Sequence, residues 1–225
     1  MHEHTEHPSI VQALLGVYSR GQFPMGEPGS RDLSLYDPDP RAIIPLDGFH
    51  VPRTLAARVR ERRFEVRTDT AFAQVIGLCA RPRPGKVGGE ETWITGDIAA
   101  MYVALHRAGH AHSVEAWLVD ADGERGLHPP TLVGGLYGVH LNGLFAGESM
   151  FSCPELGGTD ASKVCLVHLV ERLRTCGFTL LDTQFLTPHL ARFGAVEIPR
   201  REYRRRLKDA MGVRTQWALS GAHGR

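Results

Sequence analysis

The feature that most constrains the fold is a change in hydrophobic period after residue 112. Before it, apolar residues recur at helical spacing, whereas SVEAWLVD (113–120) alternates as a strand does. VGGLYGVHL and LFAGESMF then flank Asn142-Gly143, the dipeptide best suited to a two-residue hairpin turn. An amphipathic helix over 161–175 and an apolar strand over 178–186 follow. This order of hairpin, helix and strand predicts an α+β fold with a mixed sheet.

The N-terminal half is predicted to be irregular first and helical afterwards. A capping-box pattern begins at Ser9 and predicts a helix that ends near Gly21. The segment that follows is dense in Pro, Gly and Asp, which favours a small irregular domain. Further helices are predicted over 54–63, over 72–79 and from 95 to 109. The expected division is a small N-terminal domain, a larger catalytic domain and a tail, over 1–52, 53–208 and 209–225.

Composition is that of an ordinary globular protein. The chain has 225 residues, 42% of them hydrophobic, and a formal net charge of +1. No run approaches the roughly 18 apolar residues that cross a bilayer, and the histidine-rich start lacks a signal-peptide pattern. We therefore expect a cytoplasmic protein with no membrane partner. The four cysteines form no CxxC pair, so we expect buried thiols rather than disulfides or zinc ligands.

Two arginine-rich clusters are concealed by the small net charge. Six arginines lie between Arg53 and Arg67, and six basic residues lie between Arg200 and Lys208. Arginine binds phosphate through paired hydrogen bonds, which makes nucleic acid a candidate partner. A solvated helix face is the alternative interpretation, and composition does not separate the two.

Polar side chains interrupt strands that are otherwise apolar. Alternation places Asp182 and Gln184 on one face of the strand over 178–186, and Glu148 faces inward from the second strand of the hairpin. A buried carboxylate needs a partner, because burying an unpaired charge costs several kcal/mol. We expect these three residues to converge on a site. The alternative is that Asp182 and Glu148 pair with arginines in a structural network.

Two weaker patterns carry little functional information. His106, His110 and His112 have no acidic or thiol ligand at a usual spacing, so no metal is expected. GGTD (157–160) precedes a helix but lacks the P-loop pattern.

Eight sequence blocks, in order over residues 18–203, resemble the bacterial leucyl/phenylalanyl-tRNA–protein transferases. The blocks are YSRGQFPMG, DPDPRAIIP, TWIT, GHAHSVE, GGLYGVHLNGLFAGESMF, ASK, LLDTQFL and GAVEIPRREY. The resemblance implies an enzyme that transfers Leu, Phe or Met from aminoacyl-tRNA to proteins with N-terminal Arg or Lys, which marks them for N-end-rule degradation. It also implies a catalytic domain like that of GCN5-related N-acetyltransferases. The N-terminus is shorter than in longer members, so the N-terminal domain is expected to be partial.

The resemblance assigns roles to particular residues. Asp182 and Gln184 match the catalytic pair, and Glu148 matches the acidic residue of the GESMF strand. Gln184 is expected to orient the attacking amine, and Asp182 to hold it and stabilise the developing ammonium. GGTDASK (157–163) replaces the turn that binds coenzyme A in acetyltransferases, so neither coenzyme A nor another cofactor is expected.

The donor is expected to occupy three regions. The resemblance implies an apolar pocket for its side chain, lined by Leu136, Phe145, Leu169 and Leu173. It implies an adenosine site with Trp93, where Met25 replaces a family aromatic. It makes the first arginine cluster a track for the tRNA acceptor stem, with Arg53, Arg58, Arg62 and Arg63.

Three competing functions follow from the same features. One is an aminoacyl-tRNA-dependent transferase that acts on a cell-wall precursor amine, although such proteins are usually longer. The second is a basic RNA-binding module without activity. The third is a coenzyme A-dependent acetyltransferase.

Overall fold

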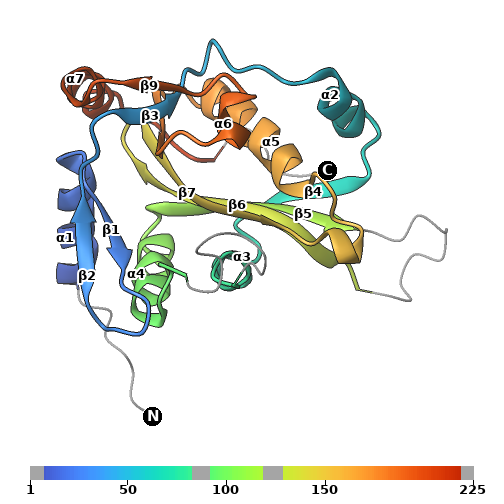
Figure 1. Cartoon of the computed structure of the whole chain (residues 1–225), viewed down its shortest axis with the longest axis horizontal. Helices are drawn as coiled ribbons and strands as arrows, with labels where there is room; N and C mark the ends of the chain where they lie inside the picture. Colours follow the sequence, from blue (N-terminus) through green and yellow to red (C-terminus); the bar gives the residue numbers. More distant parts are fainter. Residues whose placement is uncertain (1–7, 83–91, 119–128, 219–225) are drawn as a thin grey trace.

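The computed structural model describes residues 8–82, 92–118 and 129–218 and contains a large sheet covered by helices on both faces (Figure 1). The helices are α1 (Pro8–Ser19), α2 (Arg53–Arg60), α3 (Phe72–Cys79), α4 (Gly96–Arg107), α5 (Ala161–Thr175), α6 (Pro188–Ala191) and α7 (Arg200–Met211), with a 3-10 turn over Pro154–Leu156. The strands are β1 (Phe23–Gly26), β2 (Leu33–Tyr36), β3 (Arg41–Ile44), β4 (Phe64–Thr68), β5 (Ala111–Leu118), β6 (Thr131–Leu141), β7 (Leu144–Ser152), β8 (Leu180–Gln184) and β9 (Val196–Ile198).

The large sheet has seven strands in the order β4-β5-β6-β7-β8-β3-β9. Adjacent strands in the sheet are antiparallel, except for β7 and β8, which are parallel and are connected through α5. The predicted α+β fold with a mixed sheet is therefore confirmed. The predicted hairpin is also present: Leu141 pairs with Leu144, and Asn142 has a φ of 53°, as a turn of this kind requires.

The sheet opens where β7 and β8 part. The two strands pair only through three residues, the last pair being Ala146 with Asp182. β8 ends at Gln184, whose φ of 58° turns the chain out of the extended conformation. β7 continues to Ser152 along β6, so its other edge from Gly147 onward has no strand beside it among the described residues. This divergence creates a polar opening in the middle of the sheet.

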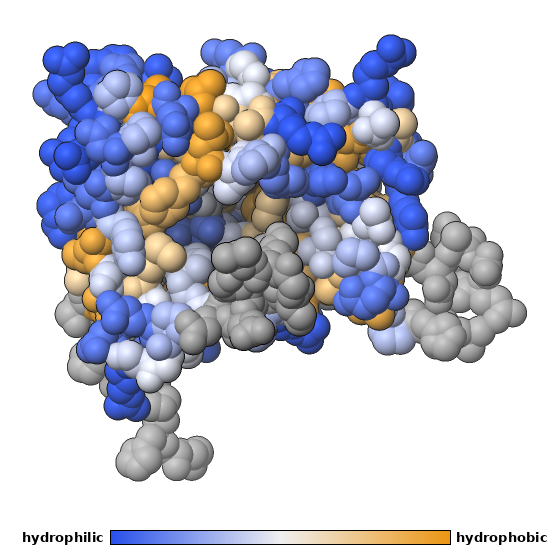
Figure 2. Space-filling view, viewed as in Figure 1, coloured by the Kyte–Doolittle hydropathy of each residue, from blue (hydrophilic) through white to orange (hydrophobic). Residues whose placement is uncertain are grey.

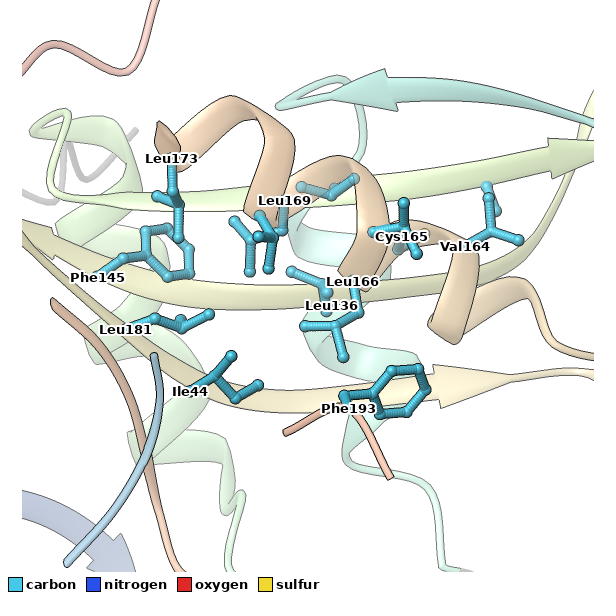
Figure 3. Close-up of a cluster of buried hydrophobic side chains, with 14 of the residues drawn as sticks. Ile44, Leu136, Phe145, Val164, Cys165, Leu166, Leu169, Leu173, Leu181 and Phe193 are labelled. Carbon is cyan, nitrogen blue, oxygen red and sulfur yellow. The ribbon is translucent and has the colours of Figure 1, made fainter. Parts of the chain in front are cut away.

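The cores on the two faces of the sheet are separate. On one face, apolar side chains of α5 pack against β6, β7 and β8 (Figure 3). On the other face, α1, α3 and α4 cover a second cluster that includes Tyr18, Tyr102 and Tyr137. A third, smaller cluster lies beneath α7 and includes Tyr203. Because neighbouring residues of a strand point to opposite faces, Phe145 joins the first core and Ala146 the second.

The predicted helices occur within a few residues of their expected bounds, and α5 has the expected limits. The N-terminal region is less separate than expected, because β3 pairs with β8 and β9 in the large sheet. Only β1 and β2 form a small sheet of their own. The division at residue 52 stays a prediction. Within the described ranges, no helix combines the length and apolar character needed to cross a membrane.

Replacing Gly134 by Ala tests the close packing of α5 on the sheet. A Cβ at this residue of β6 would lie 2.3 Å from Cβ of Ala161, the first residue of α5. We expect a loss of about 1–3 kcal/mol in the free energy of unfolding, measured by urea denaturation, because the helix and strand must move apart. Gly77 is the matched control, because it is exposed in α3 and a Cβ added there would contact no side chain or backbone beyond its own helical turn. Gly77→Ala should therefore raise the free energy of unfolding by up to about 1 kcal/mol. Equal stability of the two variants would contradict this packing.

Candidate active site

Glu148, Asp182 and Gln184 meet at the opening between β7 and β8. Gln184 Nε2 donates to Glu148 Oε1 at 3.3 Å, and the Gln184 backbone N–H donates to Asp182 Oδ1 at 2.9 Å. The structure therefore brings together the three polar residues that alternation singled out. The two carboxylates differ in their partners and in their access to solvent.

Asp182 is held by a buried ion pair. Its side chain is 0% exposed, and Arg41 donates to it from Nε at 2.9 Å and from Nη2 at 2.6 Å. Tyr203 Oη donates to Oδ2 at 2.9 Å, so with the Gln184 N–H each oxygen accepts two hydrogen bonds. A carboxylate has about four acceptor positions, and all are occupied here. The arginine network that the sequence left as an alternative thus exists for Asp182.

Arg41 is enclosed as completely as its partner. Its side chain is 1% exposed, its Nη1 donates to the carbonyl of Gly21 at 2.9 Å, and its guanidinium lies 4.7 Å from the ring centroid of Phe23. Burial lowers the pKa of Arg41, but the hydrogen bonds and charge of Asp182 outweigh burial and raise it overall. Arg41 is therefore charged. Arg41 lies in the DPDPRAIIP block but was not assigned a role from the sequence.

Glu148 is bound by two tyrosines and carries a perturbed pKa. Tyr18 Oη donates to Oε1 at 2.8 Å, Tyr102 Oη donates to Oε2 at 2.9 Å, and the two hydroxyls are 2.7 Å apart. Burial raises the pKa of Glu148 to about 7, because it outweighs the lowering effect of the two tyrosine hydrogen bonds. The residue is partly exposed. Glu148 can therefore exchange a proton near neutral pH, in contrast to the saturated Asp182.

The four residues assigned to the aminoacyl pocket lie together on the opposite face of the sheet. Figure 3 shows Leu136 and Phe145 on the sheet beneath Leu169 and Leu173 of α5. Each is at most 3% exposed, and they pack as part of the core. Trp217 of the tail stacks on Phe145 with ring centroids 5.4 Å apart. Sequence patterns do not reveal this contact, because it joins residues 72 positions apart on separate segments.

The residues expected to bind the tRNA fall into two groups. Trp93 and Met25 pack against the core beneath α1 and α4, and the Trp93 carbonyl accepts a hydrogen bond from Gly26 N–H at 3.1 Å. Three of the arginines lie at an open hollow of about 880 Å³ between α2, β4 and α5. They are Arg58, Arg62 and Arg63, which line the hollow together with Arg60. Arg53 begins α2 and is not part of its lining.

The histidines make hydrogen bonds within the protein. His112 Nδ1 is 2.8 Å from Asp69 Oδ2, and His106 Nδ1 is 2.8 Å from the carbonyl of Ala111. Asp69 lies on a turn far from both in sequence, so spacing did not reveal it. Over the described ranges, no cluster of three or more potential metal ligands is found.

The fold and the site define an α+β domain in which two carboxylates and an amide meet beside diverging strands. Comparison with protein families identifies the type: the model described as leucyl/phenylalanyl-tRNA protein transferase matches residues 43–208. The chain belongs to this family, and it is therefore an enzyme.

Curated relatives match over nearly the whole chain. Leucyl/phenylalanyl-tRNA–protein transferase of Phenylobacterium zucineum is 52% identical over 212 residues, which cover 93% of this chain and 87% of that protein. The enzyme of the same name from Herpetosiphon aurantiacus is 53% identical over 201 residues, with coverages of 89% and 93%. Among solved structures, AAC(6′)-Iy in complex with a coenzyme A bisubstrate analogue covers 72% of this chain and 98% of its own. Its TM-score is 0.34 at 16% identity, which is too low to support an argument.

Replacing Arg41 by Met tests the buried ion pair. The substitution leaves Asp182 charged and unpaired in the core, and we expect it to lower the free energy of unfolding by about 3–5 kcal/mol. Adding Asp182→Leu should recover much of this loss, because the unpaired charge is removed. Arg205→Met is the control: Arg205 is 62% exposed in its pair with Glu202, so the loss should be much smaller than for Arg41→Met. Similar losses for the two single variants, measured by urea denaturation, would show that the buried pair has no special role.

Proposed function

We propose that this enzyme transfers Leu, Phe or Met from aminoacyl-tRNA to the N-terminal Arg or Lys of acceptor proteins, in the cytoplasm, and so marks them for N-end-rule degradation. The observation that carries the proposal is the meeting of Glu148, Asp182 and Gln184 at the strand opening of a chain in this family. An aminoacyl ester is already activated. The acceptor α-amine has a pKa of about 7.7–8.0, so roughly a tenth is neutral at pH 7. The enzyme therefore needs to orient the amine and accept one proton.

Gln184 is suited to orient the attacking amine. Its Nε2 donates to Glu148, which leaves its Oε1 to accept a hydrogen bond from the amine. Asp182 acts through Gln184, because it accepts the Gln184 backbone N–H and stabilises the left-handed backbone at that residue. Direct contact of Asp182 with the amine, as expected from the sequence, would require it to give up one of four existing hydrogen bonds. We therefore assign Asp182 a positioning role.

Glu148 is suited to accept the proton. In the proposed step the amine nitrogen attacks the ester carbonyl carbon, the new C–N bond forms, and the bond to the ribose oxygen breaks. Glu148 takes the proton released from the nitrogen and returns it to the ribose oxygen as it leaves. Arg41 offsets the charge of Asp182. The negative charge that attracts the cationic side chain of the acceptor is therefore that of Glu148.

The donor would contact three regions described above. Its side chain would enter the apolar core beside Phe145, Leu169 and Leu173, where the absence of polar partners disfavours charged side chains. Its terminal adenosine would lie near Trp93 and Met25. Its acceptor stem would follow the arginines at the hollow beside α2.

The acceptor assignment is tested with leucyl-tRNA and two peptides that differ only in their first residue, Arg or Asp. We expect transfer of labelled leucine to the Arg peptide and little to the Asp peptide, since an acidic side chain is repelled by Glu148. Transfer to the Asp peptide alone would reverse the assignment. Absence of transfer to either peptide would favour a binding protein without this activity.

The role of Glu148 is tested by the pH dependence of single-turnover transfer with Glu148→Gln. In the wild type both Glu148 and the amine must lose a proton, so below pH 7 the logarithm of the rate should rise with pH with a slope of about two. The variant should be slower, with a slope of about one, because only the amine still titrates. An unchanged slope would exclude Glu148 as the proton acceptor.

The tRNA track is tested by replacing Arg58, Arg62 and Arg63 with Gln. If these side chains contact phosphates, binding should weaken and its dependence on salt should become less steep. The control replaces three exposed arginines of α7, Arg204, Arg205 and Arg206, by Gln. Equal effects of the two triple variants would indicate a general effect of charge. An unaltered salt dependence of tRNA binding in the variant of Arg58, Arg62 and Arg63 would show that these arginines form a solvated helix face and contact no phosphates.

A further inference from the structure

Exposed apolar side chains gather on two segments beside the opening. Among the described residues, seven large apolar side chains are exposed, and five of them come from β2 and from the segment that follows β8. We call these five the apolar stripe: Leu33 (42% exposed), Leu35 (47%), Tyr36 (41%), Phe185 (47%) and Leu186 (36%). Figure 2 shows apolar colour across this face, from the region near β3 and β9 to the β1–β2 ribbon at the left. A cluster of this kind typically marks a binding surface.

Aromatic contacts connect the stripe with the candidate active site. Phe185 directly follows Gln184, and its ring meets the edge of Phe23 with centroids 5.8 Å apart. Phe23 stacks on Tyr36 with centroids also 5.8 Å apart, and it lies against the guanidinium of Arg41. Tyr36 and Phe185 therefore connect the stripe with the residues that hold Asp182. Whatever binds there lies directly beside Gln184.

We propose that the apolar stripe binds the residues that follow the N-terminal residue of the acceptor, in an extended segment with apolar side chains. The inference rests on the proposed function, in which the acceptor's first residue is placed at Gln184 and Glu148. An extended chain advances about 3.3 Å per residue, so the next few residues must leave the opening across a neighbouring surface. β2 has only β1 beside it in the described sheet, so its outer edge can also pair with an extended backbone.

The charge around the stripe favours a polypeptide over tRNA. Residues 22–40, which contain β1 and β2, carry four acidic residues and a single arginine, Arg31. The acidic residues are Glu27, Asp32, Asp37 and Asp39. Asp37 and Asp39 pair with Arg200 and Arg204 of α7, so this surface is close to neutral. Phosphates are attracted instead to the arginine-lined hollow between α2, β4 and α5. Three of the five stripe residues are leucines, which offer no aromatic face for base stacking.

The test compares three acceptors with leucyl-tRNA as donor: arginine amide, a peptide with Arg followed by apolar residues, and one with Arg followed by Ser and Gly. The variants are Leu35→Ser with Tyr36→Ser on β2, and separately Phe185→Ser. We expect each to lower kcat/KM for the apolar peptide about tenfold, since apolar contact area is lost, and to change it less than about twofold for the other two acceptors. The KM for leucyl-tRNA should stay unchanged. The β2 variant is decisive, because its residues are remote in sequence from Gln184.

Leu156→Ser is the matched control, since Leu156 is 51% exposed on the 3-10 turn outside the stripe and should leave all three acceptors unaffected. An increased KM for leucyl-tRNA in the β2 variant would assign the stripe to the donor and overturn the inference. Equal effects on the three acceptors, or none on the apolar peptide, would also overturn it while leaving the proposed function intact. Failure of the wild type to transfer to any acceptor would overturn both.

Discussion

The buried pair between Arg41 and Asp182 is the interaction on which the site depends. It joins β3 to β8, and through Gly21 and Tyr203 it also ties the turn after α1 and helix α7 to the same point. Removing two charges from water is costly, and the cost is offset here by paired hydrogen bonds and by the rings of Phe23 and Tyr203, which lie near the guanidinium. The pair therefore defines the position of Gln184 from several elements at once. This rigid support suits the orienting role that the proposed function gives to Gln184.

The two carboxylates of the site have different surroundings and therefore different properties. Asp182 faces a cation, and all of its acceptor positions are occupied by hydrogen bonds from the protein. Glu148 has only neutral tyrosine and amide donors, and burial brings its pKa to about 7. Burial also raises the pKa of both tyrosines, with the charge of Glu148 acting in the same direction, so they stay protonated donors. Glu148 can thus exchange a proton near neutral pH.

Local signals in the sequence predicted much of the fold. The hairpin at Asn142-Gly143 and the limits of α5 depend on turn chemistry and amphipathic spacing, which involve residues close in sequence. Alternation along β7 and β8 was also sufficient to select Glu148, Asp182 and Gln184. Arg41 was missed because its partner is 141 residues away and its strand is only four residues long. Tyr18 and Tyr102 were missed because their helical spacing indicates core, and only the folded chain turns their hydroxyls toward Glu148.

The sheet separates the apolar core beneath α5 from the polar cluster around Glu148. Phe145 projects to the side of α5, while Glu148 contacts tyrosines on the side of α1 and α4. Under the proposed function, Leu169 and Leu173, one helical turn apart, would set the choice of cargo from the side of the sheet opposite the acids. Their exchange would then alter which amino acid is loaded without touching Glu148, at a cost in stability because both side chains are buried in the core.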